Sequence, residues 1–114
     1  DAITPVPLHP RRQAERGFNQ AETIAECLSR LLDIPLLSIL ARTRNTKQQA
    51  RLSRVERQEN VMGAFAIQKI RFGMPSRVLL VDDVFTTGST MRAGAKELRA
   101  HGARDVVGFT LARG

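Results

Sequence analysis

Blocks of apolar residues separated by polar turns give the expected order of elements along the chain. Residues 2–5 have the composition of a short strand, and the proline-rich stretch PVPLHP that overlaps its end disfavours helix. From Phe18 the apolar spacing becomes three and four residues, which predicts an amphipathic helix with Asn19 as N-cap and Glu22 completing a capping box. Pro35 blocks its continuation. The apolar stripe of this helix consists of Phe18, Ala21, Ile24, Ala25, Leu28, Leu31 and Leu32.

The rest of the chain predicts four strands and one further helix. Short strands are expected at residues 36–41 and 64–67, with a long polar segment between them. The run VLLV at residues 78–81 is typical of a strand that is buried on both faces of a parallel sheet. A helix over residues 89–100, with Gly102 past its end, leads into a last strand at residues 105–111. This order predicts an α/β fold, with a parallel twisted sheet flanked by helices.

Length and composition limit the class of protein. The chain has 114 residues and 42% hydrophobic residues, which suits one folded domain over residues 1–114. No apolar run is long enough to cross a bilayer, and the start lacks a signal-peptide pattern. The single cysteine excludes an internal disulfide, so we expect a cytoplasmic protein without membrane partners. Because a core strand is expected almost at the first residue, we also expect the domain to be truncated at its N-terminus.

Positive charge is concentrated in two polar segments. The chain has 18 Lys and Arg against 11 Asp and Glu, a net charge of +7. Arg11, Arg12 and Arg16 lie close together, and the segment RTRNTKQQARLSRVER carries six further basic residues. Such patches attract polyanions, which include nucleic acids and phosphorylated small molecules. The chain has no Trp or Tyr, so it offers few aromatic rings on which bases could stack.

The stretch VLLVDDVFTTGST, residues 78–90, places Asp82 and Asp83 at the carboxyl end of the buried strand, where parallel sheets bind ligands. The start of the following helix offers free backbone N–H groups to an anion, and Gly88 lets a phosphate approach closely. Two carboxylates beside an anion site should repel an anionic ligand. The conflict disappears if the carboxylates accept hydrogen bonds from sugar hydroxyls, or bind a Mg²⁺ ion that the ligand brings. A phosphorylated sugar satisfies both halves of the motif.

Three different kinds of site share features with this stretch but fit it less well. A response-regulator receiver also ends a strand in paired acids, but too few residues follow Asp83 for the rest of that domain. A nucleotide P-loop requires GxxxxGK[ST], and no Lys follows Gly88. A simple helix cap requires one side-chain oxygen, whereas this stretch has two acids and four hydroxyls.

Three blocks in succession resemble one protein family. VLLVDDVFTTGST resembles the phosphoribosyl pyrophosphate (PRPP) motif of type I phosphoribosyltransferases. Together with PVPLHPRR followed by RGFNQAE, and with the later LSRVER and GAF, it is similar to the ComF/GntX family of competence-associated phosphoribosyltransferase-like proteins. Full-length members of that family carry a Cys-rich, zinc-ribbon-like region at the N-terminus, which is consistent with the expected truncation.

The resemblance implies a role for each part of the site. Asp82 and Asp83 bind the ribose hydroxyls, directly or through Mg²⁺ brought with PRPP. The cradle for the 5′-phosphate consists of Thr86, Thr87, Gly88, Ser89 and Thr90. The place of the pyrophosphate loop is taken by Leu8, His9, Arg11 and Arg12. The Arg-rich segment matches a flexible catalytic loop, from which Arg44 and Lys47 are expected to act on the leaving group.

Proteins of this type displace pyrophosphate from C1 of the ribose through an oxocarbenium-like transition state, aided by cations around the leaving group and by exclusion of water. We therefore expect a phosphoribosyltransferase that acts in a competence or DNA-utilisation context. The sequence is also compatible with an oligomer of this protein. One alternative is a non-catalytic DNA-uptake module that binds single-stranded DNA or a helicase partner. Another is a regulator that senses PRPP or nucleotides. The acceptor stays open, because no hood element that recognises the nucleophile is evident.

Overall fold

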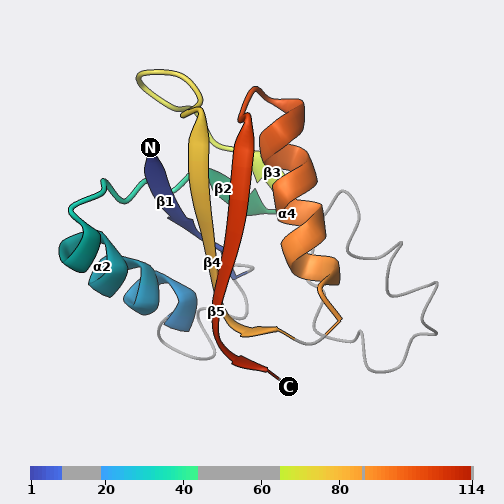
Figure 1. The fold of residues 1–114 in the computed structure, drawn as a ribbon. Coiled ribbons are helices and arrows are strands. Elements are labelled where there is room, and N and C mark those ends of the chain that lie inside the picture. The colour runs from blue at the N-terminus through green and yellow to red at the C-terminus, as the bar shows by residue number, and fades with distance from the viewer. Residues whose placement is uncertain (9–18, 44–64, 86, 114) are drawn as a thin grey trace.

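The computed structural model describes residues 1–8, 19–43, 65–85 and 87–113. The chain begins with a strand and a helix, continues with three strands in succession, and ends with a helix and a strand, as the apolar pattern predicts (Figure 1). In chain order the elements are β1 (Ala2–Pro5), α2 (Gln20–Leu32), β2 (Leu40–Arg42), β3 (Phe65–Ile67), β4 (Arg77–Phe85), α4 (Ser89–Ala100) and β5 (Asp105–Arg113).

A three-stranded parallel sheet in the order β1-β4-β5 forms the centre of the fold. β4 is its middle strand and pairs along its length with β5, from Arg77 opposite Asp105 to Phe85 opposite Arg113. Helices α2 and α4 lie on opposite sides of this sheet (Figure 1). The predicted α/β fold with a parallel sheet flanked by helices is confirmed.

Separate apolar clusters cover the central strand β4 on both faces of the sheet. On the α4 side, Val78 and Leu80 of β4 pack with Leu98 of α4 and with residues of β2 and β3. On the α2 side, Ile3 and Val81 pack against Ala25. Val78, Leu80 and Val81 are 2% exposed or less, which confirms the prediction that this run is buried on both faces.

Helix α4 approaches the sheet closely because small residues face it. Ala93, Gly94 and Leu98 are its buried residues, whereas Met91 and Ala95 are half-buried. A Cβ atom at Gly94 would lie 3.1 Å from a methyl carbon of Leu80, which is tighter than an ordinary packing contact. This close approach brings the first turn of α4 beside the carboxyl end of β4.

The prediction for residues 36–41 needs correction. Leu36 makes a single parallel bridge to Ile3, and the backbone N–H of Ile39 then donates to the buried hydroxyl of Thr4 at 3.1 Å. Beyond that point the chain leaves the parallel sheet, and β2 pairs with β3 in an antiparallel ladder that the sequence did not predict. Its residues are too few for a pairing partner to be inferred from local pattern alone.

Strands β4 and β5 are both longer than predicted. β4 continues to Phe85, since Asp82 lies opposite Thr110 and Val84 opposite Ala112 in the register with β5. The two acids therefore lie within the strand and not beyond its end. Their backbone is held by the sheet, which gives their side chains a fixed direction.

Candidate functional site

The two acids leave the central strand in opposite directions, but their carboxyl groups still approach each other, because a side-chain hydrogen bond with Asp83 is one cause of the raised pKa of Asp82. Successive side chains of a strand point to opposite faces, so Asp82 lies on the α4 side with Leu80, and Asp83 on the α2 side with Val81. The backbone N–H of Asp83 donates to Oδ1 of Asp82 at 2.8 Å, and the N–H of Val84 donates to Oδ1 of Asp83 at 2.9 Å. These bonds fix both carboxylates against their own strand.

Asp82 has an unusual electrostatic environment for a carboxyl group. Burial is the main cause, and it raises the pKa of Asp82 from 3.8 to about 7. The neighbouring Asp83 carboxylate raises the pKa further, whereas the backbone N–H of Asp83 and the charge of Arg42 act in the opposite direction. A carboxyl group with a pKa near neutrality is typical of functional sites and costs folding stability when it ionises.

The first turn of α4 faces Asp82. Gly88 is the N-cap, with a φ of 83°, a left-handed conformation that suits glycine. Because glycine has no side chain, this cap makes no side-chain hydrogen bond to the helix. The hydroxyls of Thr87 and Ser89 lie 2.9 Å apart, and the N–H of Ser89 is 3.3 Å from the Thr87 hydroxyl. A hollow of about 30 Å³ at this turn is lined by Asp82, Val84, Phe85, Gly88, Thr90 and Met91.

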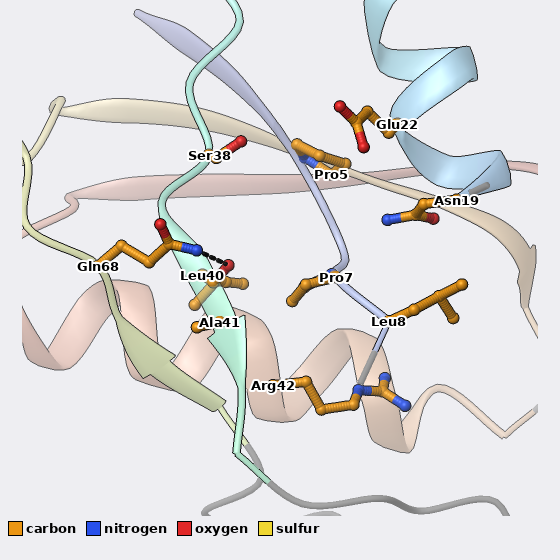
Figure 2. A pocket seen from close by; sticks show the side chains of 10 residues that line it. All are labelled: Pro5, Pro7, Leu8, Asn19, Glu22, Ser38, Leu40, Ala41, Arg42 and Gln68. Atoms are coloured by element: carbon orange, nitrogen blue, oxygen red, sulfur yellow. Dashed lines mark hydrogen bonds between the residues drawn. The ribbon is translucent and has the colours of Figure 1, made fainter. Parts of the chain in front are cut away.

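A larger cleft opens where β2 diverges from β1, with a volume of about 260 Å³ (Figure 2). Its walls come from β1 and the residues after it, the start of α2, β2, and the residue after β3. At one end Glu22 and Ser38 lie near Pro5, and at the other Arg42 lies beside Leu8 (Figure 2). The described residues that line it are Pro5, Pro7, Leu8, Asn19, Glu22, Ser38, Leu40, Ala41, Arg42 and Gln68.

Arg42 is the site residue that sequence reasoning missed. Among the described residues that line the cleft it is the only basic one, and its charge acts on Asp82. Its guanidinium carbon lies 5.0 Å from the centre of the Phe65 ring, so the antiparallel β2–β3 pair holds it in place. The sequence signal was its position as the first residue of the Arg-rich segment, directly after the strand predicted at residues 36–41.

Asn19 joins the start of α2 to the end of β1. Its Oδ1 accepts from the N–H of Ala21 at 3.0 Å, which confirms the predicted cap, and its Nδ2 donates to the carbonyl of Val6 at 3.2 Å. Asn19 is itself buried. It therefore fixes the direction in which the chain leaves β1 toward the predicted pyrophosphate loop.

Asn19→Ala is expected to lower the free energy of unfolding by about 2 kcal/mol, because it removes the cap and leaves the Val6 carbonyl without this donor. Asn19→Ser keeps a capping oxygen but is too short to reach Val6, so about half of that loss is expected. Urea denaturation of the three proteins measures both values. Equal losses for Ala and Ser would contradict the separate role of the cap.

Several predicted site residues lie outside the described residues. Leu8 is described and lines the cleft, and Thr87, Gly88, Ser89 and Thr90 form the start of α4 as predicted. The predictions for the following residues concern positions that the structure does not describe: Thr86, His9, Arg11, Arg12, Arg44 and Lys47.

The acid pair suits a metal ion that arrives with its ligand. Among the residues that the structure places, no group of three or more His, Cys, Asp or Glu side chains could hold a metal ion. Mg²⁺ prefers oxygen ligands and is usually bound by one or two carboxylates together with substrate phosphates and water. Asp82 and Asp83 therefore fit the protein's share of such a site.

The fold and the acid-bearing central strand define a phosphoribosyltransferase-type domain. The sequence profile of the family described as phosphoribosyl transferase domain matches residues 19–113. The chain belongs to this family. No helix in the described part of the chain is long and apolar enough to cross a membrane.

Similar proteins of known name are competence and DNA-utilisation proteins. Competence protein F of Haemophilus influenzae is 44% identical over 99% of the chain and 50% of its own length. Competence protein ComFC of Bacillus subtilis is 36% identical over 97% of the chain and 44% of its own length. DNA utilization protein YhgH of Escherichia coli K12 is 40% identical over 99% of the chain and 49% of its own length. The predicted membership of the ComF family is confirmed, and the chain spans about half the length of these relatives.

A solved structure shares the fold. The purine phosphoribosyltransferase from Pyrococcus horikoshii aligns with a TM-score of 0.55 and 20% identity, over 100% of this chain and 71% of that one. At this identity the likeness concerns the fold alone.

Proposed function

We propose that this chain binds PRPP together with Mg²⁺ and transfers its phosphoribosyl group to an acceptor, with release of pyrophosphate, in a competence or DNA-utilisation context. The observation that carries the proposal is the position of Asp82 on the central strand, directly beside the glycine-capped start of α4. A sugar bearing a phosphate is the ligand that meets both groups, since carboxylates accept from hydroxyls and a helix start receives an anion.

The described residues supply three parts of the proposed chemistry. Asp82 and Asp83 orient the ribose through its hydroxyls, and Mg²⁺ would neutralise charge on the pyrophosphate oxygens. The first turn of α4 receives the 5′-phosphate. Arg42, at the Leu8 end of the cleft, stabilises the departing pyrophosphate.

In the proposed reaction, the bond between C1 and the pyrophosphate oxygen breaks and its electron pair leaves with pyrophosphate. A lone pair of the acceptor forms the new bond to C1, and the acceptor releases a proton. The competence context rests on the names of the relatives in Haemophilus, Bacillus and Escherichia.

Calorimetric titration with PRPP and Mg²⁺ tests the binding step. We expect the wild type to bind, and the double variant Asp82→Asn with Asp83→Asn to lose at least about 100-fold in affinity, since two charged hydrogen-bonding partners are removed. Asp105→Asn, an exposed carboxyl at the opposite end of the sheet, is the matched control and should bind like the wild type. Absence of binding by the wild type would refute the proposal.

Release of pyrophosphate separates an enzyme from a sensor. The wild type is incubated with PRPP, Mg²⁺ and either ammonia or one nucleobase at a time. Pyrophosphate that appears only with one acceptor identifies a transferase and its substrate. Binding without release in every mixture would support a PRPP-sensing regulator in place of the enzyme.

A further inference from the structure

The turn between β3 and β4 presents an aromatic ring to solvent. The N–H of Gly73 donates to the carbonyl of Ile70 at 3.5 Å, so Arg71 and Phe72 are the two central residues of this turn. Phe72 is 90% exposed, more than any other large hydrophobic side chain in the described ranges. The turn projects beyond the amino end of β4, away from the acid pair at the other end of that strand (Figure 1).

Half-buried apolar residues on both sides hold this turn in place. Ile70 and Met74 both pack against the apolar cluster on the α4 side of the sheet. Met74 also lies beside Gly102, where a Cβ atom would be 3.7 Å from the Met74 Cβ. The aromatic ring is therefore held out from the fold by two anchored neighbours, at the cost of leaving a large apolar side chain in water.

The surroundings of Phe72 are basic. The guanidinium of Arg71 lies 5.3 Å from the centre of the Phe72 ring, and Lys69 is exposed on the near side of the turn. Exposed Arg104 lies at the same end of the sheet, where its backbone N–H donates to the carbonyl of Ser76 at 2.8 Å. Arg77 is also at this end of the sheet, but it is paired with Asp1 at 2.7 Å.

We propose that the Arg71–Phe72 turn binds single-stranded nucleic acid, with one base stacked on the Phe72 ring and the neighbouring phosphates beside Lys69, Arg71 and Arg104. A base and a phosphate are the combination that an aromatic face and adjacent cations recognise together. An apolar protein surface would have to desolvate the charges of Lys69 and Arg71. Insertion into a membrane would have Phe72 alone as its apolar anchor, because Ile70 and Met74 are engaged in the core.

Fluorescence anisotropy with a labelled oligothymidine of about 20 nucleotides tests this proposal. We expect Phe72→Ala to bind about tenfold more weakly than the wild type, and Phe72→Leu, which keeps apolar bulk without a ring, to be weakened nearly as much. Arg71→Gln should reduce the slope of log affinity against log salt by about 0.7, the value for one phosphate contact on a single strand. Thermal melts should coincide, since both side chains are exposed.

Each opposite result overturns the proposal. Wild-type affinity in Phe72→Ala means that the basic segments elsewhere bind the strand, and wild-type affinity in Phe72→Leu means that stacking plays no part. Loss of binding to anionic phospholipid vesicles in Phe72→Ala, with unchanged strand binding, would assign the turn to a membrane. The Asp82→Asn, Asp83→Asn variant should bind the strand like the wild type. The outcome of the nucleic-acid test therefore does not depend on whether the chain binds PRPP.

Discussion

Asp82→Asn is expected to raise the free energy of unfolding above about pH 7 by roughly 2 kcal/mol, because burial raises the pKa of Asp82 from 3.8 to about 7. The amide is neutral at every pH and keeps an oxygen that accepts from the N–H of Asp83. Each pKa unit corresponds to about 1.4 kcal/mol, and solvent that reaches the carboxyl reduces the full value.

The sign of this effect follows from which state holds the proton. In the unfolded chain Asp82 loses its proton near its ordinary pKa of 3.8, whereas in the folded protein it keeps the proton up to about pH 7. Between these values the folded state binds more protons, so its stability falls as pH rises, and it falls no further above about pH 7. The gain from Asp82→Asn therefore grows from about pH 4 to about pH 7 and then stays constant.

Urea denaturation of the wild type and Asp82→Asn at about pH 5, 6, 7 and 8 measures this difference. Glu26→Gln, at an exposed position on α2, is the matched control and should follow the wild type at each pH. Parallel curves for the wild type and Asp82→Asn would show that burial of the carboxyl costs nothing. Under the proposed function the same substitution weakens PRPP binding, so the variant would be more stable but less functional. Such a trade-off between stability and function is frequent at functional sites.

The contrast between the two acids shows where local pattern stops being informative. The order of apolar, acidic and hydroxyl residues in VLLVDDVFTTGST was enough to predict a buried strand and a helix that starts at Ser89. It could not distinguish Asp82 from Asp83, because burial depends on the other elements that cover each face. Asp82 shares its face with α4 and with the β2–β3 pair, and that strand pair comes from an earlier part of the chain.

Arg42 and the cleft illustrate the same limit for the remaining part of the site. The basic residues were expected to act from Arg44 and Lys47, because the resemblance pointed to the Arg-rich segment. The cation that the structure places near Asp82 comes from β2, whose antiparallel partner β3 is separated from it by more than twenty residues of sequence. Pairing at that separation depends on the packing of the whole domain, so neither the strand pair nor the cleft beside it has a local sequence signal.

Gly88→Ala is expected to lower the free energy of unfolding by about 3 kcal/mol and to weaken PRPP binding at least tenfold. A Cβ at this position would lie 2.9 Å from Cζ of Phe85 and 2.9 Å from Nη1 of Arg92. The arginine end can move away, whereas a ring carbon of Phe85 belongs to a rigid side chain that lines the hollow at this turn, so the whole ring would have to shift. The substitution thus combines overpacking with a left-handed φ of 83° for a residue that has a side chain.

Gly73→Ala is the matched control, since Gly73 has nearly the same φ of 81° but nothing within 4 Å of a Cβ. It should cost only the conformational part, about 1 kcal/mol, and leave PRPP binding unchanged at the opposite end of the sheet. The difference between the two alanine variants in urea denaturation isolates the contact with Phe85, and calorimetry with PRPP and Mg²⁺ measures the effect on the cradle. Equal costs for both variants would mean that the turn before α4 has room for a side chain, and a phosphate would then have no need of glycine there.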